Sequence, residues 1–282
     1  MTPTAGLGFK PQHFEQAVAC PAAGLWFEVH PENYMVAGGP RLAMLEVLRC
    51  DRPLSLHGVG LSLAADAPPD PDHLSRLRRL IDRFEPFAFS EHLAWSAWGG
   101  VYHADLLPFP RTVAALDRIA RNVEITQDAL GRQMLIENPS LYMPIDGHEL
   151  TEAAFLSELV RRTGCGLLVD VNNVYVSANN LGFDAAHYLD ALPAAAIDEI
   201  HMAGHTPDPD LGEALLIDTH GALIAEAVWA LLERLIERIG PRPVLIERDD
   251  NIPPFEDLLV ERDRAAGLLE NAASPRREAV HA

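Results

Sequence analysis

Eight short apolar segments are the feature of this chain that most constrains its fold. They are rich in Val, Ile, Leu and Phe, and they lie at residues 6–9, 25–30, 54–59, 87–92, 133–138, 166–171, 199–204 and 243–248. Most are followed by a longer segment with helical periodicity, as at residues 71–84, 112–130, 149–163, 183–192 and 221–239. Continuous apolar strands that alternate with helices indicate a parallel sheet covered on its outside. Eight such units close most simply into a single (β/α)8 barrel, an α/β fold.

An open, doubly wound sheet is the competing architecture. It would normally carry a glycine-rich phosphate loop after its first strand, and no G-x-G-x-x-G or Walker motif stands there. The 282 residues suit one barrel, and neither an internal repeat nor a Gly/Ser linker divides them. We therefore predict one barrel domain over residues 1–270 and a flexible C-terminal tail over residues 271–282.

The charge of the chain excludes one class of partner. Its 22 Lys and Arg residues stand against 41 Asp and Glu residues, which gives a net charge of −19. A surface of that charge repels the phosphate backbone, so we expect no nucleic-acid partner. Three cysteines without a C-x-x-C pair, no signal peptide and no long apolar segment favour a cytoplasmic protein without a membrane partner.

Polar side chains end most of the predicted strands, at the edge of the barrel where active sites of this fold lie. Six of them are at strand ends: His57, His92, Glu137, Asp170, His201 and Glu247. Asn173 follows Asp170 by three residues, and Asp218 and His220 form a D-x-H pair after the seventh strand.

Each of these residues alone has an ordinary structural role, such as a helix cap or a hydrogen-bonded core histidine. Together they predict a metal centre, because several carboxylates buried at one barrel mouth need cations to neutralise them. Oxygen and nitrogen donors without a thiolate suit iron, manganese or zinc, and nine candidates exceed what one ion coordinates. We therefore expect two or three metal ions, with Glu137 and Glu247 as possible bridges.

The segments around these residues resemble those of the multinuclear non-haem iron-dependent oxidative enzymes, the family that contains the methanobactin-biosynthesis iron enzyme. The resemblance covers about residues 6–269, and DVNNVYVSA, EIHMAGH and IDTHG in that order are its most specific motifs. The similar segments are FEVHPENYM (27–35), LSLHGVGLSL (54–63), FSEHLAW (89–95), LLPFPRT (106–112), LIENPSLYM (135–143), LLVDVNNVYVSA (167–178), EIHMAGH (199–205), IDTHG (217–221) and LIERDDNIP (245–253).

The resemblance implies a barrel like those of xylose isomerase and endonuclease IV, and it implies three iron sites. By this resemblance, the first iron would be held by Glu137, Asp170, His201 and Glu247. The second would be held by His57 and His92, with Glu137 as a bridge. The third would be held by Asn173, Asp218 and His220. Glu137, His92 and Glu247 would be the catalytic residues. Endonuclease IV has a histidine where this chain has Asn173, which points away from a trizinc phosphoesterase. The chain departs from the family at Leu181, where other members often have histidine.

The activity implied by the resemblance is oxidation of a ribosomally synthesised precursor peptide, most often at cysteine. The reaction uses dioxygen and two to three iron ions of mixed valence. A separate partner protein usually recognises the leader part of the peptide.

Several other residues are candidates for contact with substrate or for support of the ligands. We expect one of these two roles for Glu28, Glu32, Asn33 and His205. Structural roles are the simpler expectation for His30 and His103, packing for Cys165, and either packing or an aromatic wall at the barrel mouth for Trp95 and Trp98.

Two other functions remain open. A metal-dependent hydrolase or isomerase on the same barrel would act on a phosphodiester or a sugar. The negative charge disfavours nucleic acid, and no lysine ends a predicted strand, as a sugar isomerase would need. A metal-binding or metal-delivery protein is the third possibility, but it would not need so many bridging ligands.

Overall fold

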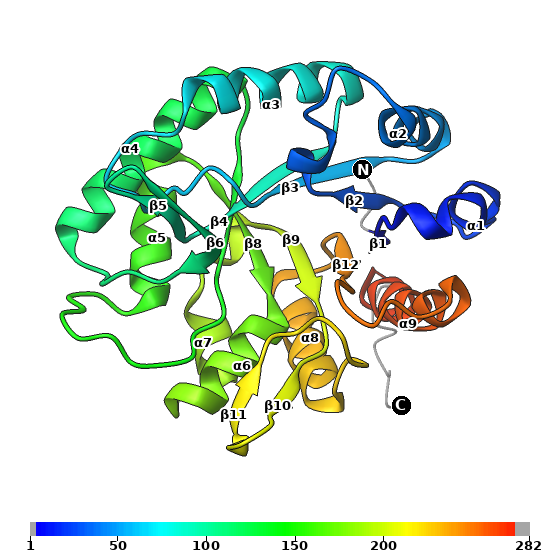
Figure 1. Ribbon diagram of the computed structural model, residues 1–282. Coiled ribbons are helices and arrows are strands. Elements are labelled where there is room, and N and C mark those ends of the chain that lie inside the picture. Colours follow the sequence, from blue (N-terminus) through cyan, green and yellow to red (C-terminus); the bar gives the residue numbers. More distant parts are fainter. Residues whose placement is uncertain (1–3, 274–282) are drawn as a thin grey trace, which may run out of the picture.

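Eight parallel strands pair side by side into a closed barrel in the computed structural model, which describes residues 4–273 (Figure 1). The strands are β1 (Ala5–Gly8), β2 (Phe27–Val29), β3 (Leu54–Gly58), β4 (Ala88–His92), β7 (Leu135–Glu137), β8 (Gly166–Asp170), β9 (Ile197–Met202) and β12 (Val244–Ile246). Each pairs with the next in this order, and β1 pairs with β12 to close the ring. Every predicted apolar segment overlaps one of these strands, so the predicted barrel is confirmed.

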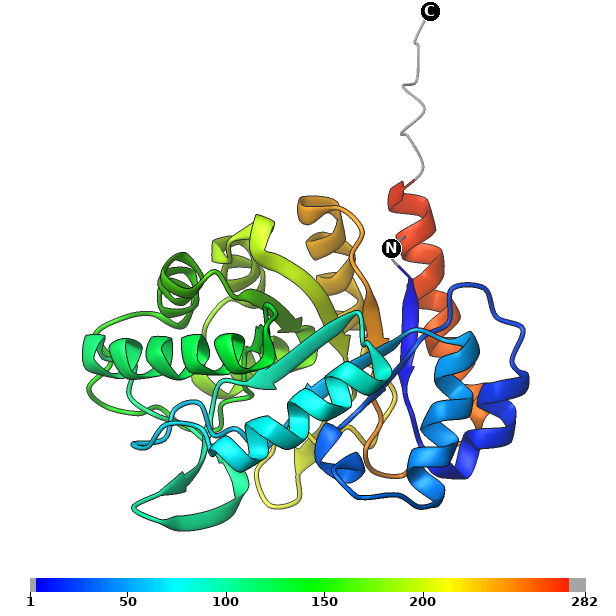
Figure 2. The same ribbon diagram turned by 90° about the horizontal axis from the view of Figure 1, so that it is seen from above.

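Helices cover the outside of the barrel. They are α1 (Phe14–Ala19), α2 (Pro40–Asp51), α3 (Pro71–Phe84), α4 (Val113–Leu130), α5 (Glu152–Thr163), α6 (Val171–Leu181), α7 (Ala185–Ala191), α8 (Glu226–Ile239) and α9 (Phe255–Ala273), with short 3₁₀ turns η1 (Pro11–His13), η2 (Pro31–Tyr34) and η3 (Ala194–Ala196). The last helix, α9, packs along β1 and β12 (Figure 2). None of the helices within residues 4–273 is both long and apolar enough to cross a membrane.

The helices begin and end where local chemistry dictates. The side chains of Thr112 and Thr151 each accept a hydrogen bond from the backbone N–H three residues later, which caps α4 and α5. Gly131 and Gly164 then end the same two helices in the left-handed conformation, which costs glycine little. Buried side chains at helical spacing, such as those of Val228, Leu232 and Leu235 in α8, attach each helix to the barrel.

Several predicted boundaries are wrong. Helix α5 begins at Glu152 rather than at residue 149, and α7 spans Ala185–Ala191 rather than residues 183–192. Helix α8 begins at Glu226 rather than at residue 221, because the preceding segment packs against the end of β9. A Cβ atom on Gly204 would lie 2.1 Å from the backbone oxygen of Ala222, so the two backbones are in close contact. Helix α9 continues to Ala273, three residues into the segment that we predicted as a tail. The rest of that segment, 274–282, lies outside the described residues.

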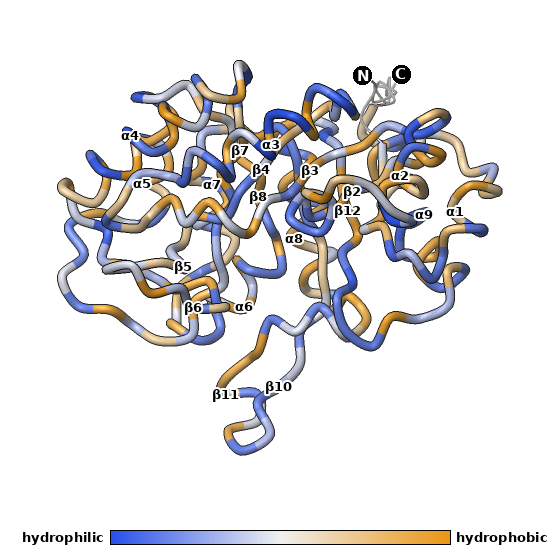
Figure 3. The backbone as a smooth tube through the Cα atoms, turned by 45° about the horizontal axis from the view of Figure 1, so that its top comes forward, coloured by the Kyte–Doolittle hydropathy of each residue, from blue (hydrophilic) through white to orange (hydrophobic). Residues whose placement is uncertain are grey.

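Two antiparallel hairpins, each after a barrel strand that carries a predicted ligand, were not predicted from the sequence periodicity. Strands β5 (Trp95–Trp98) and β6 (Val101–Leu107) follow β4, and strands β10 (Thr206–Asp208) and β11 (Gly212–Ile217) follow β9. The second hairpin projects from the body of the molecule (Figure 3). Its return strand β11 ends next to Asp218, so it places the D-x-H pair at the barrel mouth.

The interior of the barrel is polar just below its carboxyl-terminal end. Ser55, Ser90 and Glu199 are all fully buried. Each stands two residues before a predicted histidine ligand, and strand residues two apart face the same side. A polar layer therefore lies directly beneath the candidate ligands.

Candidate metal centre

The parallel register brings predicted ligands from neighbouring strands together. His92 of β4 pairs with Glu137 of β7, and Asp170 of β8 pairs with His201 of β9. These residues end their strands or lie near the end, so their side chains gather at one edge of the barrel. His57, Glu137, Asp170 and His201 are each at most 1% exposed, so the gathering is inside the protein.

Three of the ligand atoms form a tight triangle. Nε2 of His57 and Nε2 of His92 lie 3.1 and 3.0 Å from Oε2 of Glu137, and the two nitrogens lie 3.2 Å apart. An ion bound at about 2.1 Å holds neighbouring ligand atoms roughly 3 Å apart. The triangle therefore has the dimensions of part of one coordination sphere.

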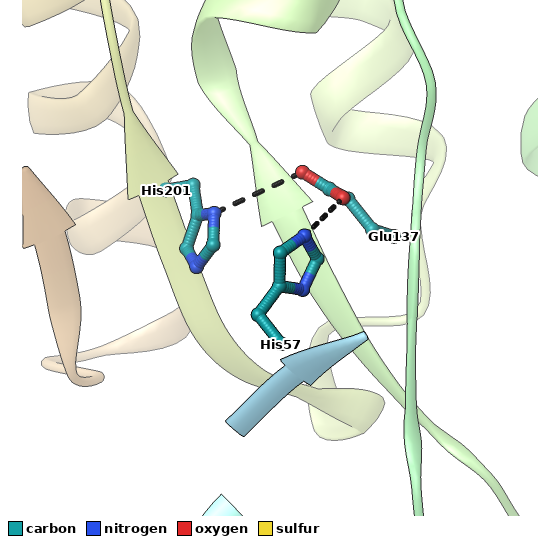
Figure 4. Close-up of side chains that lie close together, drawn as sticks. All are labelled: His57, Glu137 and His201. Carbon is teal, nitrogen blue, oxygen red and sulfur yellow. Dashed lines mark ion pairs between the residues drawn. The ribbon is translucent and has the colours of Figure 1, made fainter. Parts of the chain in front are cut away.

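The second oxygen of Glu137 faces a different histidine. Its Oε1 lies 3.8 Å from Nδ1 of His201, and Figure 4 shows the carboxylate between His57 and His201 with one oxygen toward each. Nδ1 of His201 is also 3.2 Å from Oε2 of Glu247. Glu137 thus has the geometry of a carboxylate that bridges two ions.

A third group lies beside Glu247. Ligand atoms of Asp170, His220 and Glu247 lie within 4.8 Å of one another, and Nε2 of His220 is 2.8 Å from Oδ1 of Asp218. Oδ1 of Asp170 accepts a hydrogen bond of 2.7 Å from the backbone N–H of Asn173, which leaves Oδ2 of Asp170 for the centre. Eight of the nine predicted ligands are therefore connected through their side chains, and Asn173 joins them through its backbone N–H.

The second ring nitrogen of each histidine faces an oxygen outside this cluster. The contacts are His57 Nδ1 to Ser90 Oγ (2.8 Å), His92 Nδ1 to the Gly58 carbonyl (2.9 Å), His201 Nε2 to Glu28 Oε1 (3.2 Å) and His220 Nδ1 to Asp249 Oδ2 (3.1 Å). For His57, His92 and His220 these contacts are hydrogen bonds, which hold the proton on the outer nitrogen and leave the inner nitrogen free to bind a metal. Nε2 of His201 lies close to Glu28 without a hydrogen bond.

Burial and neighbouring charges of both signs shift the pKa values of the cluster. Burial opposes ionisation of Glu137, but the neighbouring His92 and His57 outweigh it and lower the pKa of Glu137 to about 2. Burial likewise opposes the charged form of His92, yet Glu137 and Glu91 raise the pKa of His92 to about 10. Burial, with Asp218 and Glu137 close by, raises the pKa of Asp170 well above its usual value. The site as a whole is a buried, highly charged cluster.

Buried polar atoms without hydrogen bonds show that the residues fit a metal centre. Such atoms are rare in folded proteins, because each costs free energy. The buried atoms without hydrogen bonds include Glu137 Oε2, Asp170 Oδ2, Asn173 Oδ1, His201 Nδ1 and His220 Nε2. These five atoms are on predicted ligands, although other residues between 4 and 273 also have such atoms, and metal ions at the centre would supply the five missing partners.

The structure separates the four residues that we expected to contact substrate or support ligands. Glu28 supports His201 from below and is only 4% exposed. Glu32 accepts hydrogen bonds from the backbone N–H groups of Val59 and Gly60, so it holds the loop after β3. Asn33 lines a cavity beside the centre.

His205 acts on the centre through another side chain. Its Nδ1 lies 2.7 Å from Oδ1 of Asn172, and the amide nitrogen of Asn172 donates to Asp218 at 2.7 Å. His205 is therefore placed to orient a candidate ligand rather than to be one.

The remaining expectations concern five residues. His30 faces the centre, with its ring in one group with Glu247 and Asp249. His103 is exposed and lies against Trp95 on the first hairpin. Trp95 and Trp98 stack edge to face, and Trp98 is 44% exposed, as for a wall at the mouth. Cys165 is buried before β8, which agrees with packing.

Several residues that support the centre were not predicted from the sequence. The inward period of two would have revealed Glu199, two residues before His201. No local pattern marks Asp249 or Asn138; Asn138 exchanges two hydrogen bonds with the backbone of Asp170. No lysine ends a strand of the barrel, but Lys10 lies two residues after β1 and contacts Asp249 at 2.7 Å, so one lysine does stand beside the centre.

Known structures share this fold. A D-psicose 3-epimerase from Clostridium cellulolyticum H10 matches with a TM-score of 0.61 and 8% identity, over 96% of this chain and 100% of that chain. A xylose isomerase domain protein from Planctomyces limnophilus matches with a TM-score of 0.60 and 14% identity, over 96% and 98%. Endonuclease IV from Thermus thermophilus matches with a TM-score of 0.55 and 17% identity, over 96% of this chain and 100% of that chain. At these identities the likeness concerns the xylose isomerase-like barrel alone.

Close relatives and a family model cover almost the whole chain. A UPF0276 protein of Caulobacter vibrioides NA1000 is 67% identical over 279 residues, which are 99% of each chain. One from Bordetella bronchiseptica is 51% identical over 266 residues, 94% of this chain and 92% of the relative. Residues 4–270 match the model of the RiPP (ribosomally synthesised and post-translationally modified peptide) precursor modification enzymes MbnB/TglH/ChrH. The chain therefore belongs to this family of RiPP precursor modification enzymes.

Proposed function

We propose that this protein is an iron- and dioxygen-dependent oxidase that modifies a ribosomally synthesised precursor peptide at cysteine. The observation that carries the proposal is the cluster of nine nitrogen and oxygen donors at the barrel mouth. Four imidazoles in it each direct one nitrogen inward while the other faces an outer oxygen. Family membership supplies the precursor peptide as the substrate class.

The donor set favours two to three iron ions. Glu137 contacts His57 through one oxygen and His201 through the other, so it would serve two ions. Glu247 lies near both His201 and His220 and would serve as a second bridge. His57, His92 and Glu137 would hold one ion. Glu137, Asp170, His201 and Glu247 would hold the next, and Asn173, Asp218 and His220 a third. When bound, iron of mixed valence supplies an acidifying site for a thiol and a one-electron route to dioxygen.

The chain itself contributes position and exclusion of water. The buried Ser55, Ser90 and Glu199 lie beneath the centre, so substrate would approach it from the mouth. Ser90, Glu28 and Asp249 hold the histidine rings in one orientation, which fixes the inner nitrogens. A peptide side chain at the mouth would then meet a preorganised site. We also propose a partner protein that presents the leader part of the peptide.

Metal analysis of protein purified without oxygen tests the proposal. It predicts two to three irons per chain, mixed-valence Mössbauer or EPR signals, and oxidation of a cysteine in the precursor peptide encoded nearest to this chain. A serine version of that peptide is the matched control and should not react. Stoichiometric zinc together with cleavage of abasic DNA would instead place this barrel among the phosphodiester hydrolases, and sugar isomerisation among the isomerases.

A further inference from the structure

A cavity of about 200 Å³ opens beside the candidate metal centre, between the ends of β1, β2 and β12. Glu247 forms one wall, and Lys10, His30, Asn33 and Tyr34 form others. The volume is below the roughly 300–1,000 Å³ of pockets for drug-sized ligands. It therefore suits one amino-acid residue of a longer chain.

The acids that line this cavity already have partners. Glu28 and Glu247 each lie 3.2 Å from a nitrogen of His201. Asp249 binds Lys10 at 2.7 Å through one oxygen and His220 at 3.1 Å through the other. Because the Lys10 ammonium occupies Asp249, a further metal ion is a poor fit here.

Arg41 is the lining charge that lacks a partner. It lies in the first turn of α2 and is exposed at the cavity. Among the described residues, it makes no hydrogen bond or ion pair. In a chain with a net charge of −19, a guanidinium left unpaired next to a functional centre is available for an incoming anion.

Neutral donors stand beside this charge. Tyr34 is only 4% exposed, and burial raises its pKa to about 12 despite the nearby Arg41, so its phenol keeps its proton. Asn33 adds an amide on the same wall. His30 donates its Nδ1–H to the carbonyl of His57 at 3.0 Å, which fixes its ring at the cavity. A guanidinium with a phenol and an amide beside it is suited to a carboxylate.

We propose that this cavity is a carboxylate subsite in which Arg41, with Tyr34 and Asn33, anchors a carboxylate of the peptide next to the residue that is modified. The inference rests on the proposed peptide substrate. The carboxylate comes either from the end of the peptide or from an Asp or Glu side chain adjacent to the target. Arg41 is in this role a specificity-determining residue, and it is not a metal ligand.

Calorimetric titration of the iron-loaded protein with small acids and their amides tests the subsite. The first pair is N-acetylalanine and N-acetylalaninamide; the second is the corresponding pair of N-acetylcysteine compounds. We expect each acid to bind about tenfold more tightly than its amide, the worth of one charge-assisted contact. Arg41→Gln should abolish that difference. Arg121→Gln, at an exposed arginine of α4, should preserve it.

A second arm distinguishes the source of the carboxylate. Acetyl-Cys-Asp-amide carries a side-chain carboxylate in place of a terminal one, and acetyl-Cys-Asn-amide is its neutral counterpart. An Arg41-dependent preference for the Asp compound would identify an acidic side chain as the source of the carboxylate. If neither arm shows an Arg41-dependent preference, the subsite is wrong. An acid preference that survives in Arg41→Gln also overturns it, because metal then holds the carboxylate. Equal binding of the cysteine and alanine compounds contradicts the cysteine specificity alone.

Discussion

Asp249→Asn should loosen one metal ion while the others stay bound. In the structure, Asp249 accepts the Nδ1–H of His220 at 3.1 Å and the ammonium of Lys10 at 2.7 Å. In the variant Lys10 still requires an acceptor, so it holds the amide oxygen. The amide N–H₂ then faces Nδ1 of His220, which forces the proton onto Nε2, the nitrogen that faces Asp218.

The magnitude follows from the lost contact. A hydrogen bond to a charged group is worth about 1.5–3 kcal/mol, which at about 1.4 kcal/mol per factor of ten corresponds to roughly 10–100-fold in metal affinity. Substitutions of residues that orient metal-binding histidines typically have effects of this size. The backbone N–H of residue 249 still donates to the carbonyl of His220 at 3.0 Å, so we expect the loop to keep its fold.

Anaerobic titration with ferrous iron against a competing chelator, with circular dichroism as the check on folding, measures the effect. Asp82→Asn is the matched control, because Asp82 has a 2.7 Å ion pair with Arg78 on the exposed face of α3. Adding Lys10→Met to Asp249→Asn frees the amide to rotate and should restore part of the affinity. A folded Asp249→Asn protein that binds all its iron as tightly as the parent would refute the reasoning.

Three further predictions concern the centre and the scaffold. Glu137→Ala and His92→Ala should each abolish turnover while circular dichroism stays unchanged, since both side chains belong to the ligand triangle; full activity in either variant would contradict the bridging assignment. Burial raises the pKa of Glu152 from 4.5 to about 7, so the folded state binds the proton more tightly and stability falls as pH rises through this range. Glu152→Gln should therefore gain up to about 3 kcal/mol over the parent in urea unfolding between pH 5 and pH 8, and a pH-independent difference would count against it. Gly204→Ala, whose Cβ would lie 2.1 Å from a backbone oxygen, should lower the free energy of unfolding by about 1–3 kcal/mol. Gly267→Ala in α9, whose Cβ would meet nothing within 4 Å, should raise the free energy of unfolding. Equal effects of the two substitutions would exclude a steric cause.

The barrel was predictable because each strand is a short apolar run buried on both faces, and such runs have a clear signature. The candidate ligands were predictable for a related reason. In this fold functional residues lie at the carboxyl ends of strands, so the polar residues that end the apolar runs converge without knowledge of side-chain contacts. His92 and Glu137 are far apart in the sequence, yet the register makes them direct neighbours.

Supporting residues were harder to predict because their roles depend on loop geometry. Asp249 and His220 are 29 positions apart and meet only where two irregular segments cross the barrel mouth. His220 has a positive φ of 49°, a conformation that residue type alone does not indicate. The start of α8 was misplaced because Leu223 continues the helical spacing of the apolar residues that follow it. In the structure Leu223 is 72% exposed, and its neighbour Ala222 is in close contact with Gly204 after β9.

Diffraction from crystals of anaerobically prepared protein, recorded above and below the iron and zinc absorption edges, tests the central claim most directly. We predict two or three anomalous peaks at the iron edge, beside Nε2 of His57, Nδ1 of His201 and Nε2 of His220, with Glu137 between the first two. A single peak, no peak, or peaks only at the zinc edge would contradict a multinuclear iron centre.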